Sequence, residues 1–174
     1  AWMDRMLPGA EQARRQGLYA GYVEDKVVPF IRWACGNPHA RIATTGASFG
    51  AFHAMNTLCR RPDLFDTVIA MSGFYDLEHD YFKGYTDNNC YFNNPAWYVP
   101  GAQGEQLRLL RDHCSINIVA GQGAYEAPDA SRRFSQILWD KGIPNSLDIW
   151  GYDVNHDWPW WRRMLPYYVQ KLGW

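Results

Sequence analysis

The stretch RIATTGASFGAFHAMNTLCRR, Arg41 to Arg61, decides the fold of this chain. Its first residues favour a short strand, and its second half has the pattern of a helix. Between them lies Gly46-Ala47-Ser48-Phe49-Gly50. A tight strand-to-helix turn strains the central residue and brings together the residues two places on either side of it, so glycine is favoured at both. We therefore predict a strand, a sharp turn with Ser48 at its tip, and a helix over about residues 49–60.

Strand-like and helix-like segments alternate along the rest of the chain. Further strands are expected at about 66–73, 114–121 and 146–153, and helices at about 10–35, 105–112, 128–142 and from 157 onward. This alternation predicts an α/β fold, a mostly parallel sheet with helices on both faces. We expect a single domain over residues 1–174, in which 75–104, rich in Asn, Gly, Pro and aromatic residues, form a lid-like insertion.

Composition excludes several classes of protein. The 174 residues are 47% hydrophobic and 20% charged, as in an ordinary soluble globular protein. The formal net charge of −1 gives no electrostatic basis for binding nucleic acid or an anionic membrane. No apolar run is long enough to span a bilayer, and the N-terminus has no apolar signal core. We expect no nucleic-acid or membrane partner.

The four cysteines, at positions 35, 59, 90 and 114, are widely spaced and form no C-x-x-C motif. This spacing argues against a zinc site. Buried free thiols are the preferred interpretation over a disulfide framework at this chain length, which favours a cytoplasmic location. We expect neither a metal nor an organic cofactor.

Ser48 needs a base if it is to act as a nucleophile, and His156 is the preferred candidate. In a parallel sheet, sites form at the carboxyl ends of the strands. His156 follows the last expected strand, in WGYDVNHDWPWW, and so should lie at this edge. The alternative role for His156 is to cap the final helix. Of the other histidines, His39 and His113 precede strands. His79 lies in the insertion, and His53 lies in the helix after Ser48.

An acid must orient the imidazole, and the sequence leaves three candidates. Glu126 and Asp129 lie in the loop after the third strand, and Glu126 is preferred because Asp129 also suits the N-terminus of the next helix. Asp76, after the second strand, is the other alternative. With Glu126, the chain order is Ser, acid, His.

The surroundings of Ser48 supply the remaining expected parts of the site. The backbone amide of Phe49 is expected to face a developing oxyanion, supported by the positive end of the helix dipole. Aromatic residues cluster at 75–98 and 150–174 and flank the site. From these clusters we expect Tyr75 and Trp158 to line a substrate pocket.

Three stretches carry a resemblance to a known family: GASFGAFHA (46–54), VIAMSGFYD (68–76) and GYDVNHDWPWW (151–161). They resemble the α/β-hydrolase superfamily, in the esterase branch that includes S-formylglutathione hydrolase (esterase D) and enterochelin esterases. The resemblance implies a serine hydrolase that cleaves carboxylic or thioesters of small molecules through an acyl-enzyme. It also implies that Ser48 is the nucleophile and that His156, at the head of the final helix, is the base.

The chain departs from that superfamily at its start. Only 47 residues precede Ser48, whereas the family has several strands there and a loop that supplies a second oxyanion amide. The resemblance therefore implies an N-terminally incomplete fold with an open edge at the first strand, and Ala1 followed by Trp2 favours a fragment or processed product. One alternative function is a catalytically silent binding or assembly component, completed by a partner chain or by self-association along this edge. Another is an acyltransferase.

Overall fold

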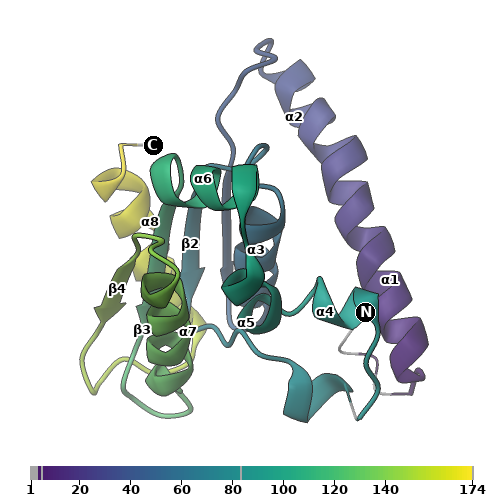
Figure 1. The fold of residues 1–174 in the computed structure, drawn as a ribbon. Coiled ribbons are helices and arrows are strands. Elements are labelled where there is room, and N and C mark those ends of the chain that lie inside the picture. Colours follow the sequence, from purple (N-terminus) through teal and green to yellow (C-terminus); the bar gives the residue numbers. More distant parts are fainter. Residues whose placement is uncertain (1–3, 5, 83, 174) are drawn as a thin grey trace.

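The sheet of this protein is parallel throughout. The computed structural model describes residues 4, 6–82 and 84–173, and in these residues four strands lie side by side in chain order (Figure 1). They are β1 (Ala43–Ala47), β2 (Thr67–Met71), β3 (Ser115–Ala120) and β4 (Ser146–Ile149). The predicted α/β class is confirmed, although β4 ends several residues earlier than expected.

The helices follow the predicted alternation. They are α1 (Gly9–Tyr22), α2 (Val28–Ala34), α3 (Phe49–Arg60), α4 (Asn88–Tyr91), α5 (Pro95–Tyr98), α6 (Gly104–Asp112), α7 (Pro128–Asp140) and α8 (Trp158–Lys171). The helix after Ser48 has the predicted bounds. Within the described part of the chain, no helix is long and apolar enough to cross a membrane.

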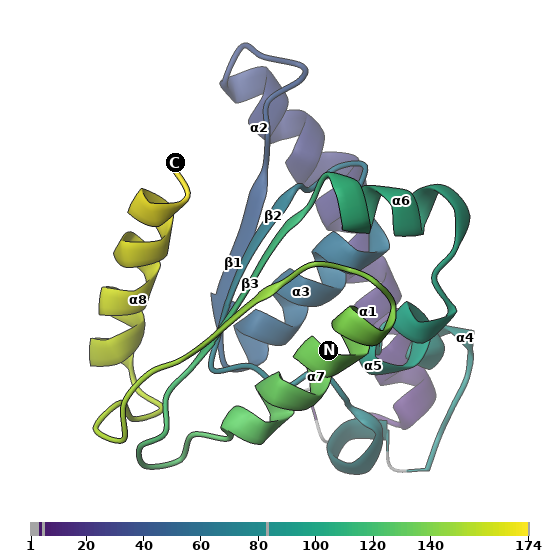
Figure 2. The same ribbon diagram turned by 60° about the vertical axis from the view of Figure 1, so that its left-hand side comes forward.

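Helices cover both faces of the sheet, as predicted (Figure 2). Alternate residues of β2 point to opposite sides because side chains in a strand alternate. Val68 and Ala70 belong to a core formed with α3 and α7. Ile69 and Met71 belong to a second core with Trp161, Met164 and Tyr168 of α8. Every residue of β2 is buried, as expected for a central parallel strand.

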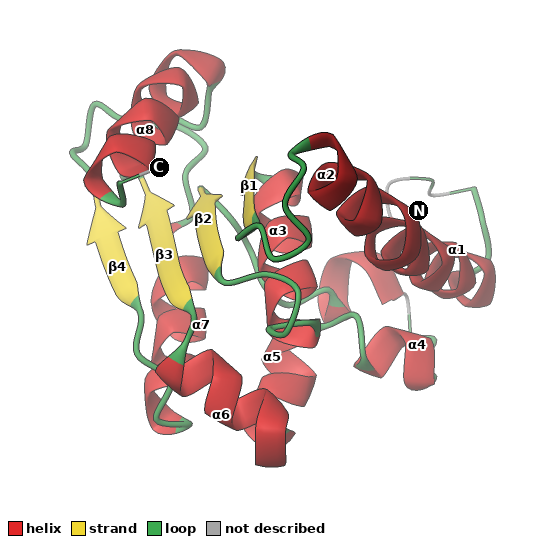
Figure 3. Ribbon diagram, turned by 90° about the horizontal axis from the view of Figure 1, so that it is seen from above, coloured by secondary structure: helices red, strands yellow, loops and turns green. Residues whose placement is uncertain are grey.

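The helices α1 and α2 follow one another in a single run of helix (Figure 3), and a π turn, Val23–Val27, lies between them. Pro29 lacks an N–H and would clash with the carbonyl of residue 25 in a regular helix, which gives a physical reason for the wider turn. The predicted helical segment over 10–35 is thus confirmed, with the π turn as a local irregularity inside it. Val23 and Ile31 pack against the core, whereas Phe30 is exposed.

The insertion at 75–104 contains short helices, and the buried Asn93 is one of the residues that join it to α3. Asn93 Oδ1 accepts hydrogen bonds from Asn56 Nδ2 and Arg60 Nη1, at 3.1 and 2.9 Å. Asn94 Nδ2 donates to Asp76 Oδ1 at 2.8 Å. The Asn94 bond lies within the insertion, whereas the two Asn93 bonds tie the insertion to α3, the helix that begins after Ser48.

The four cysteines are free thiols, in agreement with the preferred interpretation. Cys59 and Cys90 are buried, Cys114 is partly buried and Cys35 is exposed. Burial raises the pKa of the Cys114 thiol to about 12 and that of the Cys90 thiol to about 11. The buried cysteines therefore behave as small apolar core residues.

Candidate active site

Ser48 lies at the tip of a strained strand-to-helix turn. Its φ is 55° and its ψ is −120°, in a region that residues with a side chain rarely adopt. The turn is held from both directions: Ser48 N donates to Met71 O on β2 at 2.9 Å, and Ser48 O accepts from Ala51 N of α3 at 3.0 Å. Ser48 therefore stands at the carboxyl end of β1, as the sequence predicted.

The two glycines of this turn differ in what they permit. A Cβ on Gly46 would lie 2.2 Å from the backbone C and O atoms of Gly50, so only glycine fits there. A Cβ on Gly50 would meet no described atom within 4 Å. The expected requirement for glycine is thus confirmed at Gly46, where a side chain would collide with the main chain of Gly50. It is wrong at Gly50, where a side chain would point into open space.

Backbone hydrogen bonds join the loop after β3 to the loop after β4. Gly123 N donates to Val154 O at 2.8 Å, and His156 N donates to Ala124 O at 3.0 Å. The Asn155 side chain adds a third bond, since its Oδ1 accepts from Ala124 N at 2.7 Å. These bonds fix the loop that carries Glu126 against the loop that carries His156.

Glu126 and His156 meet through one side-chain oxygen and one ring nitrogen. Glu126 Oε2 lies 3.7 Å from His156 Nδ1, with 1% of the glutamate side chain exposed and 25% of the histidine. Among the described residues, neither atom has a hydrogen-bond partner. The distance is too long for a formed hydrogen bond but short enough for an ion pair with a protonated imidazole.

The other oxygen of Glu126 has a partner that the sequence analysis missed. Ser72 Oγ donates to Glu126 Oε1 at 2.6 Å, and Trp161 Nε1 donates to Ser72 Oγ at 2.9 Å. The Trp161 ring also meets the His156 ring edge to face, with centroids 5.0 Å apart. Ser72 had one sequence signal: it is the first polar residue after the apolar strand β2, at the carboxyl edge.

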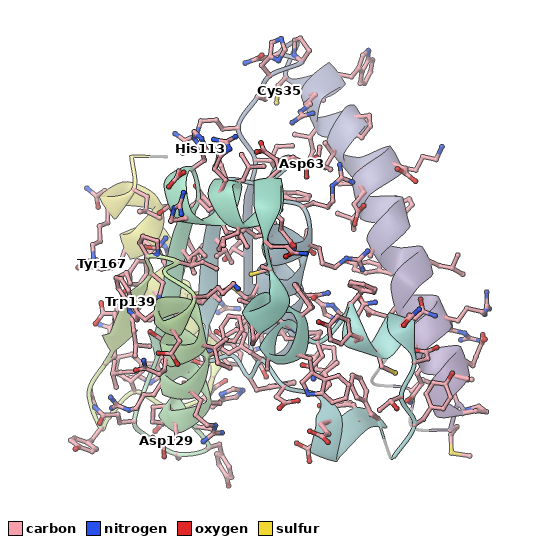
Figure 4. All side chains as sticks on the ribbon, viewed as in Figure 1. Cys35, Asp63, His113, Asp129, Trp139 and Tyr167 are labelled. Carbon is pink, nitrogen blue, oxygen red and sulfur yellow. The ribbon has the colours of Figure 1, made fainter. Side chains whose placement is uncertain are left out.

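The two alternative acids have other roles in the structure. Asp129 lies in the first turn of α7 (Figure 4), where it is exposed to solvent. Its Oδ1 lies 3.6 Å from Arg132 Nε. Asp76 accepts hydrogen bonds from Asn94 Nδ2 and from the Glu78 backbone amide. In the described part of the chain, no ion pair or hydrogen bond joins either carboxylate to His156.

Two of the other histidines, His113 and His53, have different surroundings. His113 is at the opposite end of the sheet from Asp129 (Figure 4). His53, on α3, packs among the rings of Phe49, Phe52 and Tyr19, with centroids 4.8, 5.3 and 5.8 Å away. Burial among these rings lowers the pKa of His53 to about 4.

A groove of about 500 Å³ runs past Ser48. Its walls come from the turn, from the start of α3 and from α8: Thr45, Gly46, Ala47, Ser48, Phe49, Gly50, Met71, Trp158, Trp161, Arg162 and Leu165. Trp158 thus shares a groove with Ser48. Tyr75, the other expected pocket residue, is 2% exposed and lines a different cavity of about 600 Å³ with Arg133 and Phe134. Among the described residues, no group of three or more His, Cys, Asp or Glu side chains is arranged to hold a metal ion.

The fold is of the α/β-hydrolase type. Similar solved structures include a ferulic acid esterase, with a TM-score of 0.67 and 24% identity over 84% of this chain and 57% of that one. An S-formylglutathione hydrolase from Agrobacterium tumefaciens has a TM-score of 0.65 and 15% identity, over 88% of this chain and 55% of that one. One from Staphylococcus aureus has a TM-score of 0.60 and 14% identity, over 89% and 64%. The chain thus spans a little over half the length of these proteins.

The family follows from the sequence itself. A family model described as "Putative esterase" matches residues 4–172, and the chain belongs to this esterase family. The resemblance drawn from the three quoted stretches is therefore confirmed. A comparison with curated proteins gave no significant match.

Proposed function

We propose that this chain carries the reacting groups of a serine hydrolase that cleaves carboxylic or thioesters through an acyl-enzyme. The observation that carries the proposal is the buried Glu126 carboxylate, whose Oε2 faces His156 Nδ1 at 3.7 Å on the strand edge where Ser48 stands. Membership of the esterase family supports the same chemistry. Glu126 is therefore the acid we assign, in preference to Asp129 and Asp76.

Each residue has a defined role in the proposed reaction. Ser48 Oγ attacks the acyl carbonyl while His156 takes the hydroxyl proton, and the same proton then goes to the leaving alcohol or thiol. A water molecule, deprotonated by His156, attacks the acyl-enzyme; the bond between Ser48 Oγ and the acyl carbon breaks, the acid leaves, and His156 returns the proton to Ser48 Oγ. Glu126 holds the Nδ1–H side of the ring and stabilises the imidazolium. The Phe49 amide, at the first position of α3, donates to the oxyanion.

The groove beside Ser48 indicates the kind of substrate. Met71, Trp158, Trp161 and Leu165 make its wall largely apolar, which suits an acyl or alcohol group with hydrocarbon or aromatic surface. The similar structures are described as hydrolases of ferulic acid esters and of S-formylglutathione, both small molecules. We therefore propose a small-molecule ester or thioester as the substrate.

Labelling with a fluorophosphonate tests this proposal directly. The full-length protein and its Ser48→Ala variant are incubated with the probe and read by intact mass. We expect one adduct on the wild type and none on Ser48→Ala. The matched control is Ser135→Ala, which removes a buried serine on α7 and should keep the adduct. A folded wild type without an adduct, or an adduct that survives Ser48→Ala, would contradict the proposal.

A further inference from the structure

Ser72 keeps an unfavourable backbone conformation although glycine would fit there without strain. Its φ is 53°, directly after β2, and its amide donates to Val119 O at 2.6 Å. A non-glycine residue in this region costs on the order of 1 kcal/mol or more. Strained residues of this kind cluster at active sites and ligand-binding segments, where the surrounding structure holds them in place. At Ser72 the only group that glycine would lack is the hydroxymethyl.

The direction of the hydrogen bonds at Ser72 is fixed by chemistry. An indole nitrogen can only donate, so Ser72 Oγ must accept from Trp161 Nε1, 2.9 Å away. The hydroxyl proton is then free to point to Glu126 Oε1, at 2.6 Å. An ionised carboxylate accepts this bond, and the short distance is typical of a hydroxyl donating to a charged oxygen.

Burial makes this bond important for the carboxylate. Ser72 is 5% exposed, Trp161 is 8% exposed and the Glu126 side chain is 1% exposed. A buried carboxylate is costly unless hydrogen bonds satisfy it, and Ser72 is the donor seen at Oε1. With Oε1 held, rotation of the carboxyl group is restricted and Oε2 stays directed at His156 Nδ1.

We propose that Ser72 is a positioning residue of the hydrolytic site, which acts through Glu126. Its hydroxyl, oriented by the Trp161 indole, holds one carboxylate oxygen so that the other faces the imidazole. Trp161 reinforces the arrangement from a second side, because its ring also packs against the His156 ring. This inference rests on the proposed hydrolase function and names a group that orients the acid rather than one that touches the substrate.

The first test compares two alanine variants of buried serines in the full-length protein. Ser135 is 4% exposed and donates to Asn145 Oδ1 at 2.6 Å, which matches the burial and bond length of Ser72. We expect Ser72→Ala to lower kcat for a small aryl ester, and the rate of fluorophosphonate labelling, by roughly 10-fold to 100-fold with KM little changed. We expect Ser135→Ala to keep both rates within about twofold of the wild type.

Two further variants separate the hydroxyl from the backbone and from general packing. Ser72→Gly relieves the positive φ but removes the hydroxyl, so we expect it to lose as much activity as Ser72→Ala. In a Glu126→Gln background, Ser72→Ala should change kcat by less than about twofold, because the group through which Ser72 acts has been replaced.

The possible outcomes distinguish this inference from the proposed function. If the wild type labels on Ser48 but Ser72→Gly retains full activity, or if the losses from Ser72→Ala and Glu126→Gln multiply, the positioning role is wrong while the hydrolase stands. If the folded wild type neither labels nor cleaves esters, both proposals fail together.

Discussion

The Asn155 side chain accepts a hydrogen bond from the backbone amide of Ala124 at 2.7 Å, and this bond joins the loop of the acid to the loop of the base. The next residue, His156, returns a backbone bond to Ala124 O. Asn155 is thus next to the base in the sequence, and its partner Ala124 is two residues before Glu126. The relative position of Glu126 and His156 therefore depends on this short ladder of hydrogen bonds between their loops, and not on their own side chains alone.

The ladder predicts that Asn155→Ala impairs turnover more than stability. Loss of one hydrogen bond should cost about 1 kcal/mol of unfolding free energy. Because one of the three bonds that hold the two loops together beside Glu126 and His156 is lost, the pair is held less firmly and we expect kcat to fall roughly tenfold or more. Urea denaturation and ester hydrolysis measure the two effects.

Asn37 provides a matched control for this substitution. Its Oδ1 also accepts from a backbone amide, that of His39 at 2.9 Å, but it lies before β1 at the other end of the sheet. Asn37→Ala should lose a similar amount of stability and keep its kcat. Equal kcat in the Asn37→Ala and Asn155→Ala variants would show that the side-chain bond does not position the base.

The close approach at the turn predicts opposite effects for two glycine substitutions. Gly46→Ala brings a Cβ to 2.2 Å from the Gly50 backbone, an overlap that no rotamer relieves. We expect a loss of about 3 kcal/mol or more of unfolding free energy and loss of Ser48 labelling. Gly50→Ala should be neutral or slightly stabilising, since alanine favours the helix and meets open space.

Thermal or urea unfolding of both variants, with fluorophosphonate labelling of each, measures the difference. A strongly destabilised Gly50→Ala, or a Gly46→Ala variant as stable as the wild type, would contradict the described turn.

Local sequence patterns predicted the secondary structure well because local forces decide it. The helix over 49–60 has the predicted bounds, and α7 begins at Pro128 and is followed by Gly142 at a φ of 71°, as helix-end preferences require. The parallel sheet followed from the alternation of elements. The π turn was missed, although Pro29 inside an expected helix was a visible signal of a local irregularity.

The cluster of side chains around Glu126 could not be predicted from local sequence patterns. Ser72 is 54 residues from Glu126 and 89 from Trp161 in the sequence, so their hydrogen bonds exist only after the sheet and α8 have packed. The rule that sites form at the carboxyl ends of parallel strands placed the loops of Glu126 and His156 at the same edge of the sheet. It could not separate Glu126 from Asp129, because that choice depends on which side chain turns inward.

Thiol accessibility gives a prediction for the cysteines. Cys35 is the exposed cysteine, at the end of α2, whereas Cys59 and Cys90 are buried and Cys114 is partly buried with a raised thiol pKa. With an alkylating reagent at pH 8, we expect fast modification at Cys35 alone and modification at all four sites in denaturant. Peptide mass mapping over time measures this. Fast native modification of Cys59 or Cys90 would contradict the described core, and Cys35→Ser should remove the fast phase.

The buried imidazole of His53 predicts how stability depends on pH. Desolvation holds its pKa at about 4 in the folded protein, against about 6.5 when the chain is unfolded. Between these values the unfolded state binds more protons, so the unfolding free energy falls as the pH drops from about 6.5 to 4. The full effect is roughly 3 kcal/mol, because each pKa unit corresponds to about 1.4 kcal/mol.

Replacement of this imidazole should flatten that dependence. His53→Phe keeps an aromatic ring among Phe49, Phe52 and Tyr19 but cannot bind a proton, so its loss of stability between pH 7 and pH 4.5 should be smaller than that of the wild type. Urea unfolding at both pH values measures the change, and His39→Gln, which removes an exposed imidazole, serves as the control. An identical pH slope for wild type and His53→Phe would mean that His53 is protonated in the folded protein as easily as in the unfolded chain.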